Sequence, residues 1–319
     1  MTSFYMLPLF FNRAKSIGIL QHEEKAFLGW MRETGNIFSG DEYHFRLGIF
    51  LSNKRYVEQH NAAGKSFKVA LNHLAHLTPN EYKVLLGEKP YTGERKYVKL
   101  DNVAAASVDW RTKGIVNEIK DQGQCGSCWA FSAIQACESR WAQAGHKLLS
   151  FSEQNLVDCC GGCYGCDGGW SAVAIAFVTH TQDGYFMLES DYPYTAQDGQ
   201  CKFDKMKGVG NTKGADGVEP TEEALAKAVT NGVVTISIDA SQHSFHLYSS
   251  GIYYEPACSS TFLDHAVGCV GYGTEGSQAY WIVRNSWGTT WGEKGYIRMI
   301  KDKDNNCGVA TRVELPIAL

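Results

Sequence analysis

The chain has 319 residues, 44% of them hydrophobic and 20% charged, which is enough to bury one large core or two smaller ones. Its 30 Lys and Arg residues against 34 Asp and Glu residues give a net charge of −4 without a basic stripe, which argues against nucleic acid as a partner. No apolar run approaches the roughly 18 residues that a membrane-spanning helix needs, so a membrane span is excluded.

The first hundred residues divide into an apolar start, a helical stretch and a linker. Residues 4–11 resemble a degenerate signal peptide but lack a basic leading segment and a clear cleavage site. From 21 to 61 the apolar residues recur at helical spacing among many charges, which predicts two amphipathic helices. Periodicity fades around Gly87 and Pro90, and the stretch that follows is typical of an extended linker. We expect a domain boundary at 104–106.

The remainder divides into a helical part and a strand part. From Cys128 to Ala144 apolar residues lie on almost every face, as in a helix buried on all sides, and Gly145 is a suitable stop. After Gly214 come short β-rich runs separated by glycine turns. These runs cover residues 233–238, 265–270, 280–283 and 295–300. The pattern predicts an α+β fold.

Cysteine is distributed unevenly. None of the eleven cysteines precedes Cys125, and seven lie between Cys125 and Cys166. Their clustering indicates disulfides or a metal site, and the odd total leaves at least one thiol unpaired.

Cys128 is a candidate nucleophile. A glycine-rich loop runs from Gln122 directly into the predicted buried helix and places Cys128 in its first turn. Free backbone N–H groups and the helix dipole favour an anion there, so the thiolate is favoured. The alternative is a structural disulfide at the helix entry, which suits Cys125 but leaves Cys128 unexplained.

A thiolate nucleophile needs a proton donor for the leaving amine, and His265 is the best candidate of ten histidines. It lies in a predicted strand of small and branched residues, where a polar ring is costly without a partner. By itself it would be read as a hydrogen-bonded core histidine. Asn285, after a second predicted strand, can accept from the ring and fix its tautomer.

Three stretches carry these residues in order: QGQCGSCWAFS at 122–132, LDHAVGCVGYG at 263–273 and NSWGTTWG at 285–292. In sequence and approximate spacing they resemble the papain-like cysteine proteases, the family of papain and of cathepsins L and S. The resemblance extends from about residue 21 to the end. It implies a papain-like two-domain fold, with a mainly helical domain at about 104–213 and a β-barrel-like domain at about 214–319, preceded by an inhibitory prosegment over 1–103.

The resemblance implies a role for each site residue. Cys128 would be the nucleophile of a thioester mechanism, His265 its ion-pair partner and general acid/base, and Asn285 the residue that orients His265. Gln122 would donate to the oxyanion together with the Cys128 N–H, a contact worth about 3 kcal/mol per donor. Trp287 would cover the Asn285–His265 bond. No cofactor and no metal are implied.

The resemblance also orders the cysteines. It implies three bridges, which join Cys125 to Cys166, Cys159 to Cys201, and Cys258 to Cys307. Cys160 and Cys163 then remain for a fourth, local bridge, with a zinc site in this cluster as the alternative. Cys137 and Cys269 are expected to be buried core thiols.

Substrate is expected to lie extended across glycines, because glycine lets another backbone approach closely. By resemblance Gly169 would bond the substrate main chain, beside Gly126 and Gly168. The pocket for the second side chain on the amino side of the cut would be lined by Trp170, Ser171 and Leu263, with Arg312 at its floor. Arg312 either attracts acidic side chains or turns to solvent or to Glu314, and the sequence leaves these open.

Six residues at the spacing of the family's prosegment motif lie near one helix face: Glu42, Arg46, Phe50, Asn53, Val57 and Asn61. The next motif is degraded, with His76 where the family has aspartate. Five of the ten histidines lie in the first third of the chain, so we hypothesise that acid charges them and loosens the prosegment. Solvated histidines are the alternative.

The predicted protein is a monomeric zymogen, cleaved near Ala104, that acts on proteins or peptides and is secreted or resides in a lysosome-like acidic vesicle. Its expected protein partners are its own prosegment and inhibitors of the cystatin type. The competing interpretations are a silent binding protein with this fold, a metal-stabilised module, and a peptide ligase using the same residues.

Overall fold

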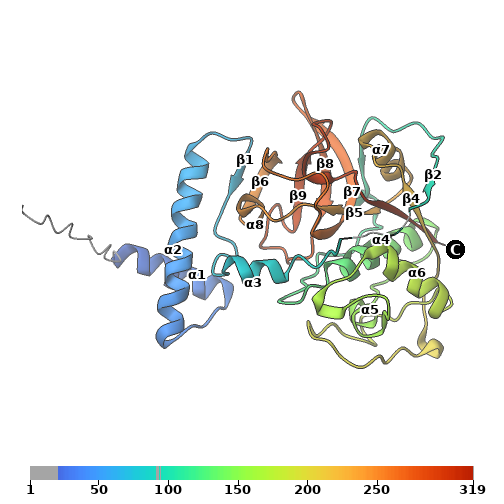
Figure 1. The fold of residues 1–319 in the computed structure, drawn as a ribbon, viewed down its shortest axis with the longest axis horizontal. Coiled ribbons are helices and arrows are strands. Elements are labelled where there is room, and N and C mark those ends of the chain that lie inside the picture. The colour runs from blue at the N-terminus through green and yellow to red at the C-terminus, as the bar shows by residue number, and fades with distance from the viewer. Residues whose placement is uncertain (1–20, 91–92, 94, 319) are drawn as a thin grey trace, which may run out of the picture.

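A computed structural model describes residues 21–90, 93 and 95–318, so the candidate signal peptide at 4–11 lies outside the described residues. The N-terminal segment, residues 1–103, contains the elements at the left of Figure 1 and the linker that crosses the molecule. Its elements are α1 (Gln21–Thr34), α2 (Gly40–Ala62), β1 (Phe67–Val69), α3 (Pro79–Val84) and β2 (Tyr97–Val98). The two predicted helices of residues 21–61 are confirmed.

α1 and α2 are held together by aromatic side chains on their facing sides. The Phe27 and Trp30 rings lie 5.2 and 5.4 Å from the Phe50 ring. α3 begins with a capping box, in which Thr78 and Glu81 exchange side-chain and backbone hydrogen bonds. Glu81 also holds the guanidinium of Arg46, with two N–O distances of 2.7 Å. These contacts join the three helices into one small unit.

The helical half lies at the lower right of Figure 1 and contains α4 (Cys128–Gln143), α5 (Glu153–Cys159) and α6 (Ser171–Thr181). Short 3-10 turns lie at Trp110–Lys113, Gly165–Asp167 and Lys205–Lys207. The helix predicted from Cys128 is confirmed as α4, and twelve of its sixteen residues are buried. A helix this apolar on all sides can only be stable inside a core, which is the place that α4 takes.

The strand half, at the upper right of Figure 1, is a twisted sheet with two short helices. Its elements are β4 (Thr212–Val218), α7 (Glu222–Asn231), β5 (Val234–Ile238), α8 (His243–His246), β6 (Tyr248–Tyr253), β7 (His265–Glu275), β8 (Gln278–Arg284), β9 (Tyr296–Ile300) and β10 (Val313–Ala318), with a 3-10 turn at Asn306–Gly308. The four predicted β-rich runs are confirmed as β5, β7, β8 and β9.

The sheet runs in the order β1-β6-β9-β8-β7-β5-β10-β4-β2, and β3 (Val108–Asp109) pairs with β7. Residues 108–109 thus belong to the sheet of the strand half, although they precede α4 in sequence. β1 pairs antiparallel with β6, with Phe67 opposite Gly251. The N-terminal segment therefore covers an edge that the strand half would otherwise expose.

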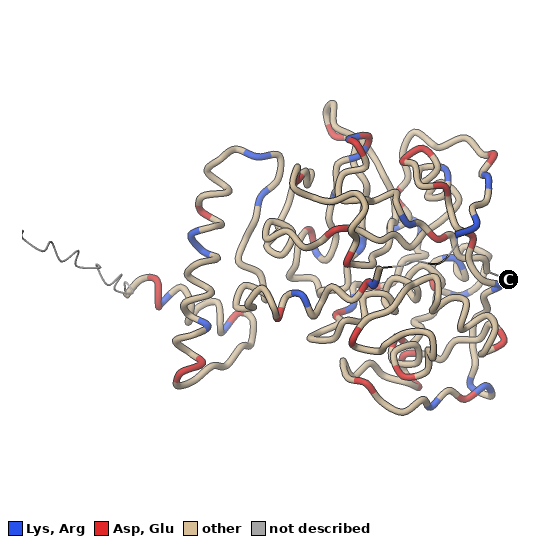
Figure 2. The backbone as a smooth tube through the Cα atoms, in the orientation of Figure 1, with Lys and Arg blue, Asp and Glu red and all other residues tan. Residues whose placement is uncertain are grey.

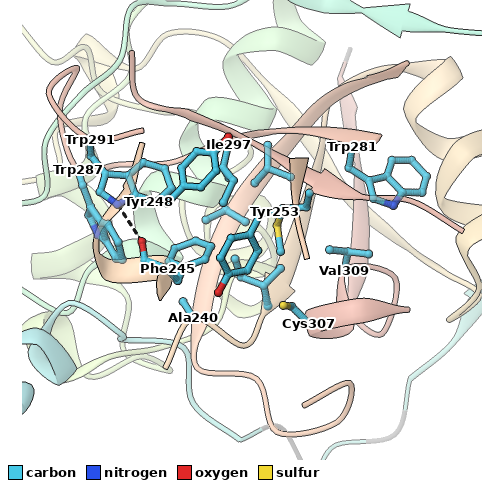
Figure 3. Close-up of a cluster of buried hydrophobic side chains, with 14 of the residues drawn as sticks. Ala240, Phe245, Tyr248, Tyr253, Trp281, Trp287, Trp291, Ile297, Cys307 and Val309 are labelled. Carbon is cyan, nitrogen blue, oxygen red and sulfur yellow. Dashed lines mark hydrogen bonds between the residues drawn. The ribbon is translucent and has the colours of Figure 1, made fainter. Parts of the chain in front are cut away.

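One apolar core links the strand half to the N-terminal segment. It holds the aromatic cluster of Figure 3, in which the Trp291 indole N–H donates to the Phe245 carbonyl at 3.2 Å. The Tyr253 ring lies 4.6 Å from that of Phe67 in β1. The helical half has a separate core centred on α4. Docking of the N-terminal segment thus depends on burial against the strand half.

Charges of both signs are interspersed along the backbone of both halves (Figure 2). Among the described helices, none combines the length and the apolar character needed to cross a bilayer.

Candidate active site

The candidate nucleophile lies where the two halves meet. Cys128 is the first residue of α4, a helix long enough to present a full dipole at this end. Ser132, one turn later, donates its hydroxyl to the Val267 carbonyl of β7 at 2.8 Å. This contact between α4 and β7 places the Cys128 sulfur beside the start of β7, where it accepts from the Ala266 N–H at 3.5 Å.

His265 and Asn285 come together because β7 and β8 are antiparallel neighbours. Gly268 pairs with Arg284, so the first residue of β7 lies beside the residue that follows β8. The Asn285 amide oxygen can only accept, so His265 Nε2 donates to it at 2.8 Å. His265 Nδ1 therefore carries the lone pair, and it has no hydrogen-bond partner among the described residues. A ring in this tautomer is ready to take a proton at Nδ1.

Trp287 shields the histidine. Its ring lies 4.7 Å from that of His265 and is almost fully buried, with Phe245 and Trp291 on its other sides. Water is thereby kept from the His265–Asn285 hydrogen bond.

Gln122 is fixed by a residue that the sequence did not single out. Ser286 donates its hydroxyl to Gln122 Oε1 at 2.6 Å, so the amide nitrogen must face the other way. Gln122 Nε2 donates to the carbonyls of Leu85, at 3.0 Å, and Cys125, at 2.8 Å. Leu85 belongs to the N-terminal segment, so a peptide carbonyl already lies against the expected oxyanion donor. Ser286 follows Asn285 in the motif at 285–292. Its role in orienting Gln122 could not be predicted, because it depends on the tertiary contact between Ser286 and the loop that carries Gln122.

Residues 85–89 of the N-terminal segment fill the cleft. Gly169 donates its N–H to the Gly87 carbonyl at 2.9 Å and accepts from Lys89 N–H at 3.2 Å, while Glu88 N–H donates to the Asp264 carbonyl at 3.0 Å. The Trp170 indole N–H donates to the Lys89 carbonyl at 2.9 Å. The sequence predicted only a linker for residues 85–89. These residues are bound mainly through backbone hydrogen bonds, which leave no periodic pattern of side chains in the sequence.

Glycines allow this close approach, as expected. A Cβ on Gly87 would lie 1.8 Å from the Gly126 oxygen, and one on Gly168, whose φ is +116°, would lie 2.5 Å from the Gly87 oxygen. Leu263 is buried, and a Cβ on Gly308 would lie 2.4 Å from its Cδ2, so its part in a substrate pocket stays a prediction.

Arg312 lines the cavity around Trp170 and Ser171 and faces an acidic side chain of the N-terminal segment. It is neither turned to solvent nor paired with Glu314. Its guanidinium lies 3.7 Å from the Glu88 carboxylate and donates to the Lys89 carbonyl at 3.2 Å. Glu314 is paired with Arg95 instead. Glu88 and Lys89, the two partners of Arg312, belong to the N-terminal segment. No local sequence pattern could reveal the position of that segment relative to Arg312.

Burial keeps the reacting pair neutral in this form. It raises the pKa of the Cys128 thiol to about 12, against the opposing effect of the Ala266 and Gly87 N–H groups. It also lowers the pKa of His265 to about 4, against the effect of the Asn285 hydrogen bond. Both side chains are fully buried, so the charged forms lack the water that would stabilise them.

Eight of the eleven cysteines form disulfides. The structure joins Cys125 to Cys166, Cys159 to Cys201, Cys160 to Cys163, and Cys258 to Cys307. Cys128, Cys137 and Cys269 are free and buried. All four sulfur atoms between 159 and 166 are thus used in bridges.

The chain is similar to known proteins in both sequence and structure. Residues 104–317 match the family described as papain family cysteine protease, and residues 27–82 match the cathepsin propeptide inhibitor domain. The chain is 43% identical over 285 residues to digestive cysteine proteinase 1 of Homarus americanus, covering 85% of this chain and 87% of that protein. It is 40% identical over 303 residues to procathepsin L of Mus musculus, covering 90% of each. The structure of digestive procathepsin L 3 from Tenebrio molitor larval midgut aligns with a TM-score of 0.86 at 37% identity, over 93% of this chain and 99% of that one.

Proposed function

This chain belongs to the papain family of cysteine proteases and carries a propeptide inhibitor domain, and from this premise we propose that it is an endopeptidase whose catalytic residues are Cys128, His265, Asn285 and Gln122. The observation that carries the proposal is the peptide already in the cleft. The Leu85 carbonyl accepts from Gln122 while the Gly87 backbone passes the Cys128 sulfur. A substrate in the same groove would offer its carbonyl to the same donor.

The proposed reaction starts when the Cys128 thiol proton passes to His265 Nδ1, with Nε2–H held by Asn285. The sulfur attacks the peptide carbonyl carbon, and the resulting oxyanion accepts from Gln122 Nε2 and the Cys128 N–H. As the C–N bond breaks, His265 gives its proton to the leaving amine. His265 then takes a proton from water, which attacks the thioester and frees Cys128.

The direct test is covalent labelling. An epoxide thiol inhibitor, applied after acid processing, should modify Cys128 alone among the three free thiols. The loss of peptide hydrolysis should be proportional to the fraction of Cys128 that is modified. Modification without loss of activity, or labelling at Cys137 or Cys269, would contradict the proposal.

We propose that residues 1–103 are removed near Ala104 on activation, and that residues 85–89 are the inhibitory part. Replacing Gly87 with alanine should release the cleft, because its Cβ would meet the Gly126 oxygen and displace the bonds to Gly169 and Asp264. Each lost bond costs about 1 kcal/mol, so the intact zymogen should react with the epoxide at least about tenfold faster at neutral pH. Intact-mass measurement gives the rate.

Gly48→Ala is the matched control, since no atom lies within 4 Å of a Cβ at this position of α2. Equal labelling rates in the two variants would show that residues 85–89 do not gate the cleft.

Acid should loosen the N-terminal segment through histidines at its contact with the strand half. His246 Nε2 donates to the Leu74 carbonyl at 2.9 Å, and burial lowers the pKa of His246 to about 3. Burial also lowers the pKa of His76, and Arg46 acts in the same direction. The titratable and charged groups around these two histidines are His73, His243, Tyr82 and Glu81. Because both pKa values lie below the usual value of about 6.5, docking is favoured fully above about pH 6.5 and less as pH falls towards 3.

His76→Phe tests this dependence on pH. Phenylalanine keeps the ring contacts that His76 makes with Trp30 and Phe38, at 5.4 Å each, but cannot take a proton. The gain in self-processing rate between about pH 7 and about pH 5 should shrink by up to about tenfold, the equivalent of one pKa unit. His44→Phe, on the exposed side of α2, is the control, and an unchanged profile in His76→Phe would remove His76 from the mechanism.

We further propose that the protein is secreted or held in a lysosome-like acidic vesicle. Four disulfides are typical of an oxidising compartment. The relatives named digestive proteinases and procathepsin L support the same assignment. We propose a monomer that takes protein or peptide substrates, and inhibitors of the cystatin type as partners. Size-exclusion chromatography and cell fractionation test these assignments.

A further inference from the structure

A cavity of about 630 Å³ opens beside the cleft, between α6 and the strands β5 and β10. Its polar lining includes Ser237 of β5 and two oppositely charged residues, Arg312 and Glu314. The aromatic side chain of Trp170 forms part of the wall. It is therefore a pocket of mixed polarity with a cation in its lining.

The N-terminal segment inserts the Glu88 side chain into this cavity. Gly87 passes the nucleophile, and the main chain of Glu88 is held by Asp264 on one side, so its side chain points to the adjacent pocket. Glu88 Oε1 accepts from the Ser237 hydroxyl at 2.8 Å and lies 3.7 Å from the Arg312 guanidinium. Only 6% of Glu88 is exposed, and burial raises the pKa of its carboxyl to about 7, against the opposing effects of Ser237 and Arg312.

We propose that, in the mature enzyme, Arg312 and Ser237 make this pocket selective for an acidic side chain. The side chain would belong to the second substrate residue on the amino side of the scissile bond. This inference rests on the proposed function. An extended substrate that replaces residues 85–89 offers its own side chain at the position that Glu88 leaves. The Arg312 side chain is only 18% exposed, and a cation with so little access to water is costly without an anion, so a glutamate or aspartate restores a pairing that a neutral residue cannot.

Glu314 is the internal competitor for Arg312. In the zymogen its carboxylate is paired with Arg95, and its side chain is only 14% exposed. When residues 1–103 leave, Glu314 loses Arg95 while Arg312 loses Glu88. Because both remain in the lining of one cavity, Glu314 then attracts Arg312 and repels an acidic substrate. Removing its charge should therefore sharpen the selectivity.

The experiment compares three peptides that differ only in glutamate, glutamine or leucine at that position. The full chain is activated by self-processing, its active sites are titrated with the epoxide, and kcat/KM is measured at roughly pH 6, where a peptide glutamate is ionised. We expect the glutamate peptide to exceed the glutamine peptide by about tenfold or more, as for a charge-assisted contact. Arg312→Met should reduce the ratio to about one, and Glu314→Gln should raise it.

Lys213→Met is the matched control, because it removes a cation from the exposed side of β4 and should leave the ratio unchanged. The comparison of peptides in the unaltered protein decides the inference even if a variant fails to fold. Hydrolysis of the leucine and glutamine peptides without preference for glutamate would overturn the pocket assignment alone. Absence of hydrolysis of all three, with no labelling of Cys128, would overturn the proposed function as well.

Discussion

Replacing Cys128 with alanine is expected to abolish both peptide hydrolysis and self-processing. The proposed thioester cannot form without the sulfur, and no other described thiol lies at the cleft, since Cys137 and Cys269 are buried elsewhere in the core. Loss of a nucleophile costs on the order of 10⁵-fold or more in kcat. The measurement is hydrolysis of a fluorogenic peptide, with the full-length band followed on a gel after acidification.

Cys137→Ala is the matched control, because it removes a buried thiol from the same helix without touching the cleft. It should keep near-normal activity per titrated site after processing. If Cys128→Ala still processed itself at a rate within tenfold of the unaltered protein, the nucleophile would have to be sought elsewhere.

Replacing Gln122 with alanine is expected to lower kcat by about 10²- to 10³-fold with little change in KM. Gln122 Nε2 is oriented by the Ser286 hydroxyl before any substrate arrives, so its hydrogen bond to the developing oxyanion needs no reorganisation. A contact made mainly in the transition state affects kcat, whereas one made equally to the ground state affects KM.

Ser286→Ala separates orientation from donation. It leaves the Gln122 amide in place but frees it to rotate, so kcat should fall by less than in Gln122→Ala, and the double variant should fall no further than Gln122→Ala alone. A rise in KM at constant kcat in Gln122→Ala would contradict an oxyanion role.

Local sequence patterns predicted the elements that carry the proposed catalytic residues. The helix that begins at Cys128 was predicted because apolar residues on all its faces require a buried helix. The strand that starts at His265 and the strand that ends just before Asn285 were predicted from their β-branched runs and glycine turns. Their antiparallel pairing then brings His265 Nε2 within 2.8 Å of Asn285 Oδ1. Cys128, His265 and Asn285 were singled out from their local sequence and Gln122 by resemblance to a family, and their roles remain proposals.

The contacts of residues 85–89 were beyond the sequence. Glycine at 87 and a glutamate at 88 within a linker carry no periodicity, and their partners Gly169, Asp264 and Ser237 lie between about 80 and 180 residues away.

The sequence by itself determined the two helices at 21–61, the buried helix that begins with a thiol at Cys128, and four strands, one of which carries His265, because each depends on neighbours within a few turns of chain. Only the tertiary structure decided that Arg312 meets Glu88 and that Gln122 holds the carbonyl of Leu85. Those contacts exist because β1 pairs with β6 and because α2 and α3 pack aromatic side chains on α8 of the strand half. Their position is the result of many weak interactions between distant segments, and no single stretch of residues encodes it.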